Sequence, residues 1–495
     1  MKLSQINQYY ANRSVLITGG TGFIGKILCE KLIRSCPQIK TVYILLRPKP
    51  NQTIGQRLDT EIIGSEIFSH NITTNCPKIL DKLVAIGGNI CEPGLGLSTT
   101  DRQLLINEVS VVYHLAASVK FNESLDKLID QNVWGTNEVM KLCDKMIKLE
   151  AVIYLSTAFS NCNMKIIGEN VYKLKHTAVD TMAAIRTVGQ TYGYSSDTLA
   201  MRELMDDRPN PYTFSKAIAE NLVTEQYSHL PIVIVRPSIV TSVLKEPIPG
   251  WINNYNNGPT FFVLMLMMGI IRICEFLVDG KTDLIPVDIL VNGLIVTAWH
   301  TANYPNDRHM VINMASSTIN PITNRQFFDY LKPSIVSVPS HQMVRPVADI
   351  LTKPIANKFQ RLWYQLYRYF LINEWTIHAE NYYKIYSRLS PEDQLTYYSD
   401  VRKIDWKSYI CCLYLGVRRY QLREDDSNID SARKLAIIKS IIILSGSANS
   451  SDGNNCVGNR TVREVSASSY TCFWPTGFQS DGTSGVSDKY TYDSS

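Results

Sequence analysis

The sequence lacks several features that would place it in other protein classes. None of its 11 cysteines forms a CxxC pair, so neither a zinc ribbon nor a thioredoxin-like redox site is expected, and no metal site is predicted. The first 14 residues lack the apolar core of a secretory signal, which predicts a chain that starts in the cytosol with reduced thiols. The net charge of +5 over 495 residues is small and indicates no nucleic-acid partner.

What the sequence does contain is ordinary globular material: 45% of residues are hydrophobic and 19% are charged, enough to bury a large core. The length suggests two or three domains. Apolar runs with little alternation are typical of strands buried on both faces of a parallel sheet, and they occur at 14–18, 41–46, 82–86, 111–116, 152–156 and 231–236. Helical stretches at 22–35, 132–149 and 212–228 lie between them. This alternation predicts an α/β fold with a doubly wound parallel sheet.

The remaining segments differ in character. Residues 164–210 are polar and interrupt the rhythm, so we interpret them as an insertion near the substrate side of a first domain, 1–335. Aromatic and leucine residues recur at helical spacing over 359–370, which predicts a smaller, mostly helical C-terminal domain over 340–436. Residues 445–495 are rich in Ser, Gly and Asn and are predicted to be a disordered tail.

A glycine-rich turn follows the first predicted strand and opens a helix. It has the GxxGxxG spacing, and its residues are Gly19, Gly20, Thr21, Gly22, Phe23, Ile24 and Gly25. Glycines let the backbone turn tightly and approach a pyrophosphate, and the free N–H groups of the helix N-terminus attract the phosphates. Glycines at this spacing can also mark a simple tight turn, but the strand before and the helix after favour a dinucleotide site.

The end of the second predicted strand indicates which dinucleotide is bound. Sites that prefer NAD place an acidic residue there, whereas this sequence has Arg47, with Lys49 nearby. A cation at this place suits the 2′-phosphate of NADPH. The alternative is a solvated charge at a strand end.

Tyr212 and Lys216 form a YxxxK pair. On a helix these two residues share one face, so an ammonium can lower the pKa of the phenol and hold a nicotinamide ribose. Ser156 and Thr157 end an apolar strand, where a hydroxyl can bind a substrate carbonyl. Asn132 begins a predicted helix and is as well explained by an N-cap as by a catalytic role.

The sequence resembles the extended short-chain dehydrogenase/reductase superfamily, and within it the eukaryotic fatty acyl-CoA reductases. The resemblance covers roughly residues 10–436 and rests on TGGTGFIGK (18–26), LLRPK (45–49), GNICEPGLGLS (88–98), HLAASVKF (114–121), LSTAFSN (155–161), PYTFSKAIAE (211–220), RPSIV (236–240), EPIPGW (246–251) and IPVD (285–288). NEW (373–375), IDWKSY (404–409) and GVRRY (416–420) resemble the C-terminal domain of that family.

The resemblance implies a Rossmann-type fold and reduction of a long-chain fatty acyl-CoA to a fatty alcohol with two NADPH. It implies that Thr157 rather than Ser156 is the active hydroxyl. It also implies cofactor contacts from Lys216, Ala116, Ile90 and Asn89, the last standing where the family usually has Asp. Two alternatives stay open: a reductase acting on a nucleotide sugar or steroid, and a cofactor-binding sensor without turnover.

The resemblance also raises membrane attachment, because many animal members end in an anchoring segment. Here residues 435–444 are too short to span a bilayer. The apolar segment 261–278 has three interpretations, a core helix, the wall of an acyl tunnel or a membrane-facing helix, and Arg272 within it argues against a spanning helix. The basic flanks of 359–370 leave an interfacial role open. We expect a cytosol-facing protein with peripheral association, at the peroxisomal or endoplasmic reticulum membrane; its oligomeric state is open.

Overall fold

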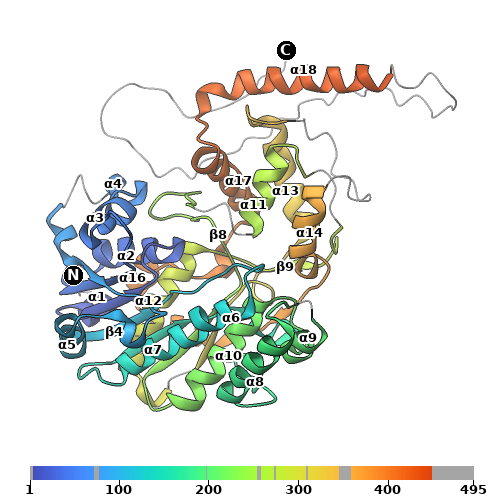
Figure 1. The fold of residues 1–495 in the computed structure, drawn as a ribbon. Helices are drawn as coiled ribbons and strands as arrows, with labels where there is room; N and C mark the ends of the chain where they lie inside the picture. Colours follow the sequence, from blue (N-terminus) through green and yellow to red (C-terminus); the bar gives the residue numbers. More distant parts are fainter. Residues whose placement is uncertain are drawn as a thin grey trace.

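A seven-stranded parallel sheet forms the centre of the protein (Figure 1). The computed structural model describes residues 4–71, 77–196, 198–253, 258–271, 275–307, 310–344 and 358–448. The strands lie in the order β11-β7-β5-β4-β1-β2-β3. Their bounds are β1 Ser14–Thr18, β2 Thr41–Leu46, β3 Leu83–Gly87, β4 Val109–His114, β5 Ala151–Leu155, β7 Ile232–Pro237 and β11 Val311–Met314. The chain runs outward from β1 in both directions, which is the predicted doubly wound Rossmann-type order.

The six predicted strands are confirmed to within two residues at each end. The sequence pattern missed β11, a four-residue edge strand whose register pairs Val311 with Ile234 of β7. A run this short gives little periodic signal, and its pairing depends on the strand already in place beside it.

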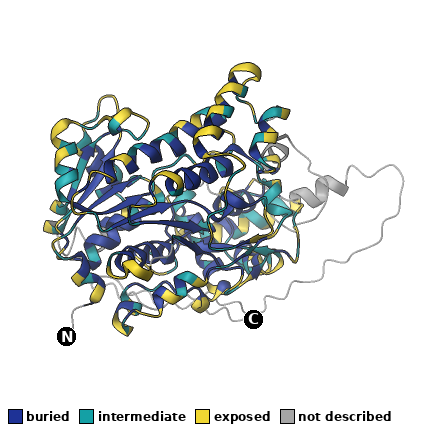
Figure 2. Cartoon of the chain, turned by 90° about the horizontal axis from the view of Figure 1, so that it is seen from below, coloured by how far each residue is buried: buried dark blue, intermediate teal, exposed yellow. Residues whose placement is uncertain are grey.

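Side chains of each central strand alternate between two hydrophobic clusters, one on each face of the sheet. In β1, Val15 and Ile17 enter one cluster while Leu16 enters the other. The first face is covered by α2 (Phe23–Ser35) and α12 (Val287–Asn303), and the second by α7 (Gly135–Cys143) and α10 (Pro211–Gln226). Burial is therefore concentrated in the sheet and its flanking helices, with exposed residues on the outer surface (Figure 2).

The predicted insertion 164–210 contains a short strand and two helices. They are β6 (Ile166–Ile167), α8 (Ala178–Tyr192) and α9 (Leu199–Met205). The two helices pack together, and α8 also packs on α10. This segment therefore joins β5 to the helix that carries Tyr212.

The C-terminal part is mostly helical and shares its core with the sheet domain. Its helices are α14 (Lys358–Leu371), α15 (Glu380–Tyr386), α16 (Pro391–Thr396), α17 (Trp406–Gly416) and α18 (Ile429–Ala448). β13 (Thr376–Ile377) pairs in parallel with β6, and one hydrophobic cluster runs from Ile6 to Leu422. In Figure 1, α14 and α17 lie with α11 (Gly258–Met267) and α13 (Asn324–Ser337) at the upper right of the sheet.

The chain end departs from expectation in one respect. The predicted disordered tail begins at residue 445, but α18 extends to Ala448, so the first four residues of that tail are helical. Residues 449–495 lie outside the described residues. Arg272 also lies outside them. Among the helices that the structure describes, none is long and apolar enough to cross a membrane. Most of α11 is buried, which favours the core or tunnel-wall interpretation of 261–278.

Candidate active site

The predicted site residues follow the carboxyl ends of neighbouring strands. Gly19 follows β1, Arg47 follows β2, Asn89 lies just beyond β3, Ala116 just beyond β4, and Thr157 just beyond β5. Because these strands are parallel, the five positions gather at one edge of the sheet. That edge is where doubly wound sheets bind their ligands.

The glycine turn is held by close backbone contacts. Gly19 has a φ of +76°, and a Cβ there would lie 2.8 Å from the backbone nitrogen of Ala116. A Cβ on Gly25 would lie 2.2 Å from the carbonyl oxygen of Gly19. Gly22 is the N-cap of α2, so the N–H groups of Phe23, Ile24 and Gly25 in the first helical turn have no carbonyl to bind within the helix. The turn therefore presents backbone donors at a helix N-terminus, as phosphate binding requires.

The two cations after β2 differ in their surroundings. Arg47 is exposed, and its backbone carbonyl accepts a hydrogen bond from Arg57. Lys49 is paired with Glu61 at 2.7 Å. Arg47 is therefore the better placed of the two for a phosphate at this edge.

The Asn89 side chain forms hydrogen bonds within its own loop after β3. Its Nδ2 donates to Glu92 (3.0 Å), and its Oδ1 accepts from the backbone N–H of Cys91 (3.2 Å). Ile90 packs against Gly135 of α7, so closely that a Cβ added to Gly135 would lie 3.1 Å from the Ile90 side chain. Direct contact of Asn89 and Ile90 with a cofactor stays a prediction.

Three predicted catalytic groups come together at the junction of β5 and α10. Thr157 is 6% exposed, and its hydroxyl accepts from the backbone N–H of Phe159 (3.2 Å). Tyr212 lies in the first turn of α10 and is hydrogen-bonded to Thr157. One turn later, Lys216 donates from Nζ to the carbonyl oxygen of Leu155 (2.7 Å). The structure therefore places a threonine hydroxyl and a phenol together, with an ammonium one helical turn farther along α10.

The pKa of Tyr212 is shifted in the direction opposite to the one expected from its neighbour Lys216. Burial raises the pKa of Tyr212 to about 12, and the hydrogen bond with Thr157 offsets only part of that rise. Burial also lowers the pKa of Lys216 to about 8, against the attraction of Glu220. The ammonium is bound to a backbone carbonyl, and Lys216 is not among the causes of the tyrosine shift. Tyr212 is therefore a protonated phenol at neutral pH and is suited to donate a proton.

Two other predicted catalytic residues require correction. Ser156 donates its hydroxyl to Glu220 (2.5 Å), so it is occupied away from Tyr212 and not free to bind a carbonyl. Asn132 is not an N-cap, because it lies inside continuous helical backbone from Leu125 to Cys143. Its amide accepts from Ser118 N–H (2.8 Å) and donates to Ser118 O (3.0 Å) and Ser215 Oγ (2.9 Å). Asn132 thus ties the segment after β4 to α10.

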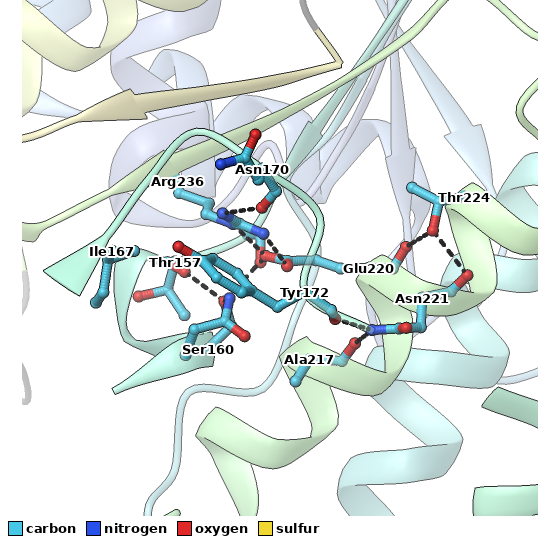
Figure 3. A network of polar contacts seen from close by, with 12 residues as sticks. Thr157, Ser160, Ile167, Asn170, Tyr172, Ala217, Glu220, Asn221, Thr224 and Arg236 are labelled. Carbon is cyan, nitrogen blue, oxygen red and sulfur yellow. Dashed lines mark hydrogen bonds and ion pairs between the residues drawn. The ribbon is translucent and has the colours of Figure 1, made fainter. Parts of the chain in front are cut away.

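A buried ion pair that the sequence did not predict lies next to these groups. Glu220 and Arg236 are 1% and 0% exposed and lie 2.6 Å apart (Figure 3). The available signal was a charged residue in two apolar surroundings, the middle of helix 211–226 and the end of strand 232–237. Buried Glu and Arg are rare unless paired, so these surroundings could have predicted an ion pair between Glu220 and Arg236.

An apolar pocket adjoins the catalytic groups. Its cavity volume is about 110 Å³, and its lining comprises Phe159, Ile239, Gly258, Pro259, Phe262, Phe276, Lys281, Thr282, Asp283, Leu284, Asn324, Phe327, Phe328, Tyr367, Phe370, Leu371 and Trp375. The rings of Phe121 and Tyr212 stack at 5.7 Å, and Phe121 contacts Tyr367 and Phe370, each at 5.5 Å. Aromatic rings therefore connect the catalytic phenol to the pocket wall.

The residues present fit a nicotinamide dinucleotide. The glycine turn would hold its pyrophosphate, and Lys216 its nicotinamide ribose. The cradle is specific, since a Cβ at Gly19 or Gly25 would collide with backbone atoms. Within the described residues, no group of His, Cys, Asp and Glu could hold a metal ion.

Comparisons with known proteins agree with this geometry. A family model described as "Male sterility protein" matches residues 17–294, and a second with the same description matches 350–424. Fatty acyl-CoA reductase 1 of Rattus norvegicus is 33% identical over 463 residues, covering 87% of this chain and 88% of that protein. The Xenopus laevis fatty acyl-CoA reductase 1 is 34% identical, and fatty acyl-CoA reductase 2 of Mus musculus is 32% identical; they cover 87% of this chain and 88% and 89% of their own.

Solved structures show the same fold at lower identity. The terminal R domain of the myxalamid PKS-NRPS pathway aligns with a TM-score of 0.59 at 19% identity, covering 84% of this chain and 92% of its own. The reductase domain of a nonribosomal peptide synthetase from Mycobacterium tuberculosis gives 0.57 at 17% identity, covering 83% and 92%. The fatty acyl-CoA reductases named above are 32–34% identical to this chain over 87% of its length. The chain therefore belongs to the fatty acyl-CoA reductase family.

Proposed function

We propose that this protein is an alcohol-forming fatty acyl-CoA reductase that uses two NADPH per long-chain acyl-CoA. The observation that carries the proposal is the apolar pocket that Phe121 links to Tyr212. Most of its lining side chains are apolar, so it can bury an alkyl chain and offers few groups that could bind the hydroxyls of a nucleotide sugar. Product analysis with palmitoyl-CoA and NADPH tests it.

In the proposed mechanism the thioester carbonyl oxygen lies against the hydroxyls of Thr157 and Tyr212. The bound cofactor supplies the hydride. Both hydroxyls donate hydrogen bonds to the negative charge that develops on the oxygen. Tyr212 is a protonated phenol near neutral pH because its pKa is about 12, so it can act as the general acid.

Two reductions are needed to reach an alcohol. In the first, a hydride adds to the carbonyl carbon, the C–S bond breaks to give the aldehyde, and the departing CoA thiolate takes a proton from Tyr212, which solvent then reprotonates. In the second, the aldehyde gains a hydride and its oxygen receives the proton of Tyr212. Aromatic side chains between Tyr212 and the pocket would retain the aldehyde while the dinucleotide exchanges.

Enlarging the pocket at Phe328 is expected to shift the preference toward longer acyl chains. Phe328 lines the pocket and its ring centre lies 5.5 Å from that of Phe262 and 4.6 Å from that of Phe276. Each methylene newly buried there contributes about 0.8 kcal/mol, or about fourfold in affinity. We expect Phe328→Ala to raise the ratio of kcat/KM for stearoyl-CoA over myristoyl-CoA. An unchanged ratio, with an unchanged KM for NADPH, would place the acyl chain elsewhere.

Removing the cation after β2 is expected to reduce the preference for NADPH. A hydrogen bond to a charged group contributes about 1.5–3 kcal/mol, so Arg47→Ala should lower the ratio of kcat/KM for NADPH over NADH about 10- to 100-fold. Lys49→Ala is the matched control, because Lys49 is already paired with Glu61, and its effect should be smaller. Equal ratios for wild type and Arg47→Ala would show that Arg47 does not bind the 2′-phosphate.

A peripheral membrane association of a cytosol-facing enzyme, at the peroxisomal or endoplasmic reticulum membrane, stays a prediction. Its support is the pair of apolar side chains Ile437 and Ile438 of α18, which are 61% and 53% exposed, and the basic residues that flank the aromatic stripe over 359–370. Basic residues beside apolar side chains can hold a protein at an anionic membrane surface. Flotation with anionic liposomes is the direct test, and a protein that stays unbound would contradict it.

A further inference from the structure

The buried carboxylate of Glu220 receives more hydrogen bonds than a simple ion pair requires. Oε1 accepts from Ser156 Oγ (2.5 Å), Ser160 Oγ (3.0 Å) and Arg236 Nε (2.9 Å), while Oε2 accepts from Arg236 Nη2 (2.6 Å). These donors come from β7, from the residue that follows β5 and from the short helix Ala158–Asn161. One side chain of α10 therefore gathers three separate segments (Figure 3).

The segments joined by Glu220 are those that carry the catalytic groups. Ser156 immediately precedes Thr157, and Ser160 also donates to the carbonyl oxygen of Thr157 (2.9 Å). Glu220 lies one helical turn beyond Lys216 and two beyond Tyr212, on the same helix. The carboxylate thus fixes the end of β5 against the helix that bears the phenol and the ammonium.

Arg236 extends the same network to the loop after β6. Its Nη1 donates to the backbone carbonyl oxygens of Asn170 (3.0 Å) and Gly168 (3.4 Å), and its guanidinium lies 5.7 Å from the ring centre of Tyr172. A buried ion pair is not in itself a stabilising device, because a hydrophobic pair of similar volume often stabilises as much or more. Packing alone therefore does not account for a charged pair at this place.

We propose that Glu220 is a positioning residue for the proposed reduction: it sets the place of Thr157 relative to Tyr212 and the electrostatic environment of Lys216. The inference rests on the proposed function, because it takes those three residues as the reacting group. Glu220 touches neither substrate nor cofactor in this account. It acts through the hydroxyls of Ser156 and Ser160 and through its charge.

The charge has a definite direction of effect. Burial lowers the pKa of Lys216 to about 8, and the negative charge of Glu220 opposes that fall. His114 of β4 and Tyr154 of β5 also face this region: Lys216 helps to lower the pKa of His114, and the Lys216 Nζ lies 5.0 Å from the Tyr154 ring centre. Burial keeps both neutral by lowering the pKa of His114 to about 3 and raising that of Tyr154.

Two further groups complete the surroundings. The pKa of Arg208 is raised by the charge of Glu220 against the lowering effect of burial, and Arg236 is paired with Glu220. Glu220 is thus the anion that supports the charge of Lys216 among these groups.

The test is the pH dependence of kcat/KM in the full-length enzyme, with palmitoyl-CoA and NADPH, for wild type and Glu220→Gln. Lys216 acts as a cation, so activity is present below its pKa and falls as the pH rises through it. Removing the negative charge of Glu220 lowers the pKa of Lys216. The loss of activity with rising pH should therefore begin at a pH lower by about one unit. The lost tether should also lower kcat at the pH optimum by about tenfold or more. Glu220→Asp should recover part of both effects.

Glu30→Gln is the matched control. Glu30 is equally buried and is paired with Arg34 one turn along α2, but it lies away from Lys216. It should lower the melting temperature without moving the alkaline limb of the profile. A folded Glu220→Gln enzyme with a wild-type alkaline limb would overturn the inference, as would Glu30→Gln producing the same shift.

A second variant keeps the test decisive if Glu220→Gln does not fold. Ser156→Ala/Ser160→Ala removes the hydroxyl tethers but leaves the ion pair. We expect kcat to fall about tenfold with the pH profile unmoved, and an unchanged kcat would overturn the positioning role. Failure here is distinguishable from failure of the proposed function: only in the latter would the wild-type protein leave palmitoyl-CoA and NADPH unconsumed.

Discussion

Tyr212→Phe is expected to lower kcat/KM for acyl-CoA reduction about 10²- to 10⁴-fold, the range associated with loss of a positioned general acid. The substitution removes a single oxygen, that of the phenol hydroxyl, which is hydrogen-bonded to Thr157. Burial raises the pKa of this phenol to about 12. The ring can still stack on Phe121, so the fold and the pocket wall should be retained. Steady-state NADPH oxidation with palmitoyl-CoA measures the effect.

Tyr227→Phe is the control for that substitution. Tyr227 follows α10 directly, is 8% exposed, and donates to Asn137 (2.7 Å), so it loses a buried phenol hydroxyl at the far end of the same helix. Its activity should stay within about twofold of wild type, with a stability loss of about 1 kcal/mol. A Tyr212→Phe enzyme as active as Tyr227→Phe would remove Tyr212 from the mechanism.

Gly25→Ala is expected to weaken NADPH binding about 100-fold or more, because the cost falls on backbone rather than on a flexible side chain. The new Cβ would lie 2.2 Å from Gly19 O and 2.7 Å from Gly20 Cα, so the whole turn must move. Overpacking of this kind costs about 1–3 kcal/mol in stability. The displaced turn also loses charge-assisted hydrogen bonds to the pyrophosphate, at about 1.5–3 kcal/mol each. Fluorescence titration with NADPH measures the affinity.

Gly55→Ala provides the comparison. Gly55 lies in the first turn of α3 (Ile54–Leu58), and a Cβ there would meet nothing within 4 Å. The substitution should leave NADPH affinity unchanged and raise stability by about 0.4–1 kcal/mol, since alanine restricts the unfolded chain. If Gly25→Ala bound NADPH as tightly as Gly55→Ala does, the nucleotide would not lie over this turn.

The parts of the fold that follow from local chemistry were predictable. Continuous apolar runs identified six of the seven strands, and the glycine turn identified the end of β1 as the nucleotide edge. β11 was missed because its four residues carry no periodic pattern and its placement depends on β7. The N-cap interpretation of Asn132 was wrong because the helix begins earlier, at Leu125, through an irregular turn at Ile129–Trp134.

The site was predictable as a set of residue types but not as a set of partners. Thr157 and Tyr212 are hydrogen-bonded neighbours and Lys216 lies one turn farther along α10, whereas the Ser156 hydroxyl donates to Glu220, a partner that no local pattern indicates. Glu220 and Arg236 are 16 residues apart, and nothing local pairs them. The rise in the pKa of Tyr212 depends on burial by residues distant in sequence, such as Phe121, which no local pattern reveals.

The most direct test of the account is the stoichiometry of a single reaction. Purified protein incubated with palmitoyl-CoA and excess NADPH should oxidise two NADPH for each thioester consumed, releasing free CoA and hexadecanol, identified by mass spectrometry. Thioester that stays intact, or one NADPH oxidised with hexadecanal as the final product, would contradict it.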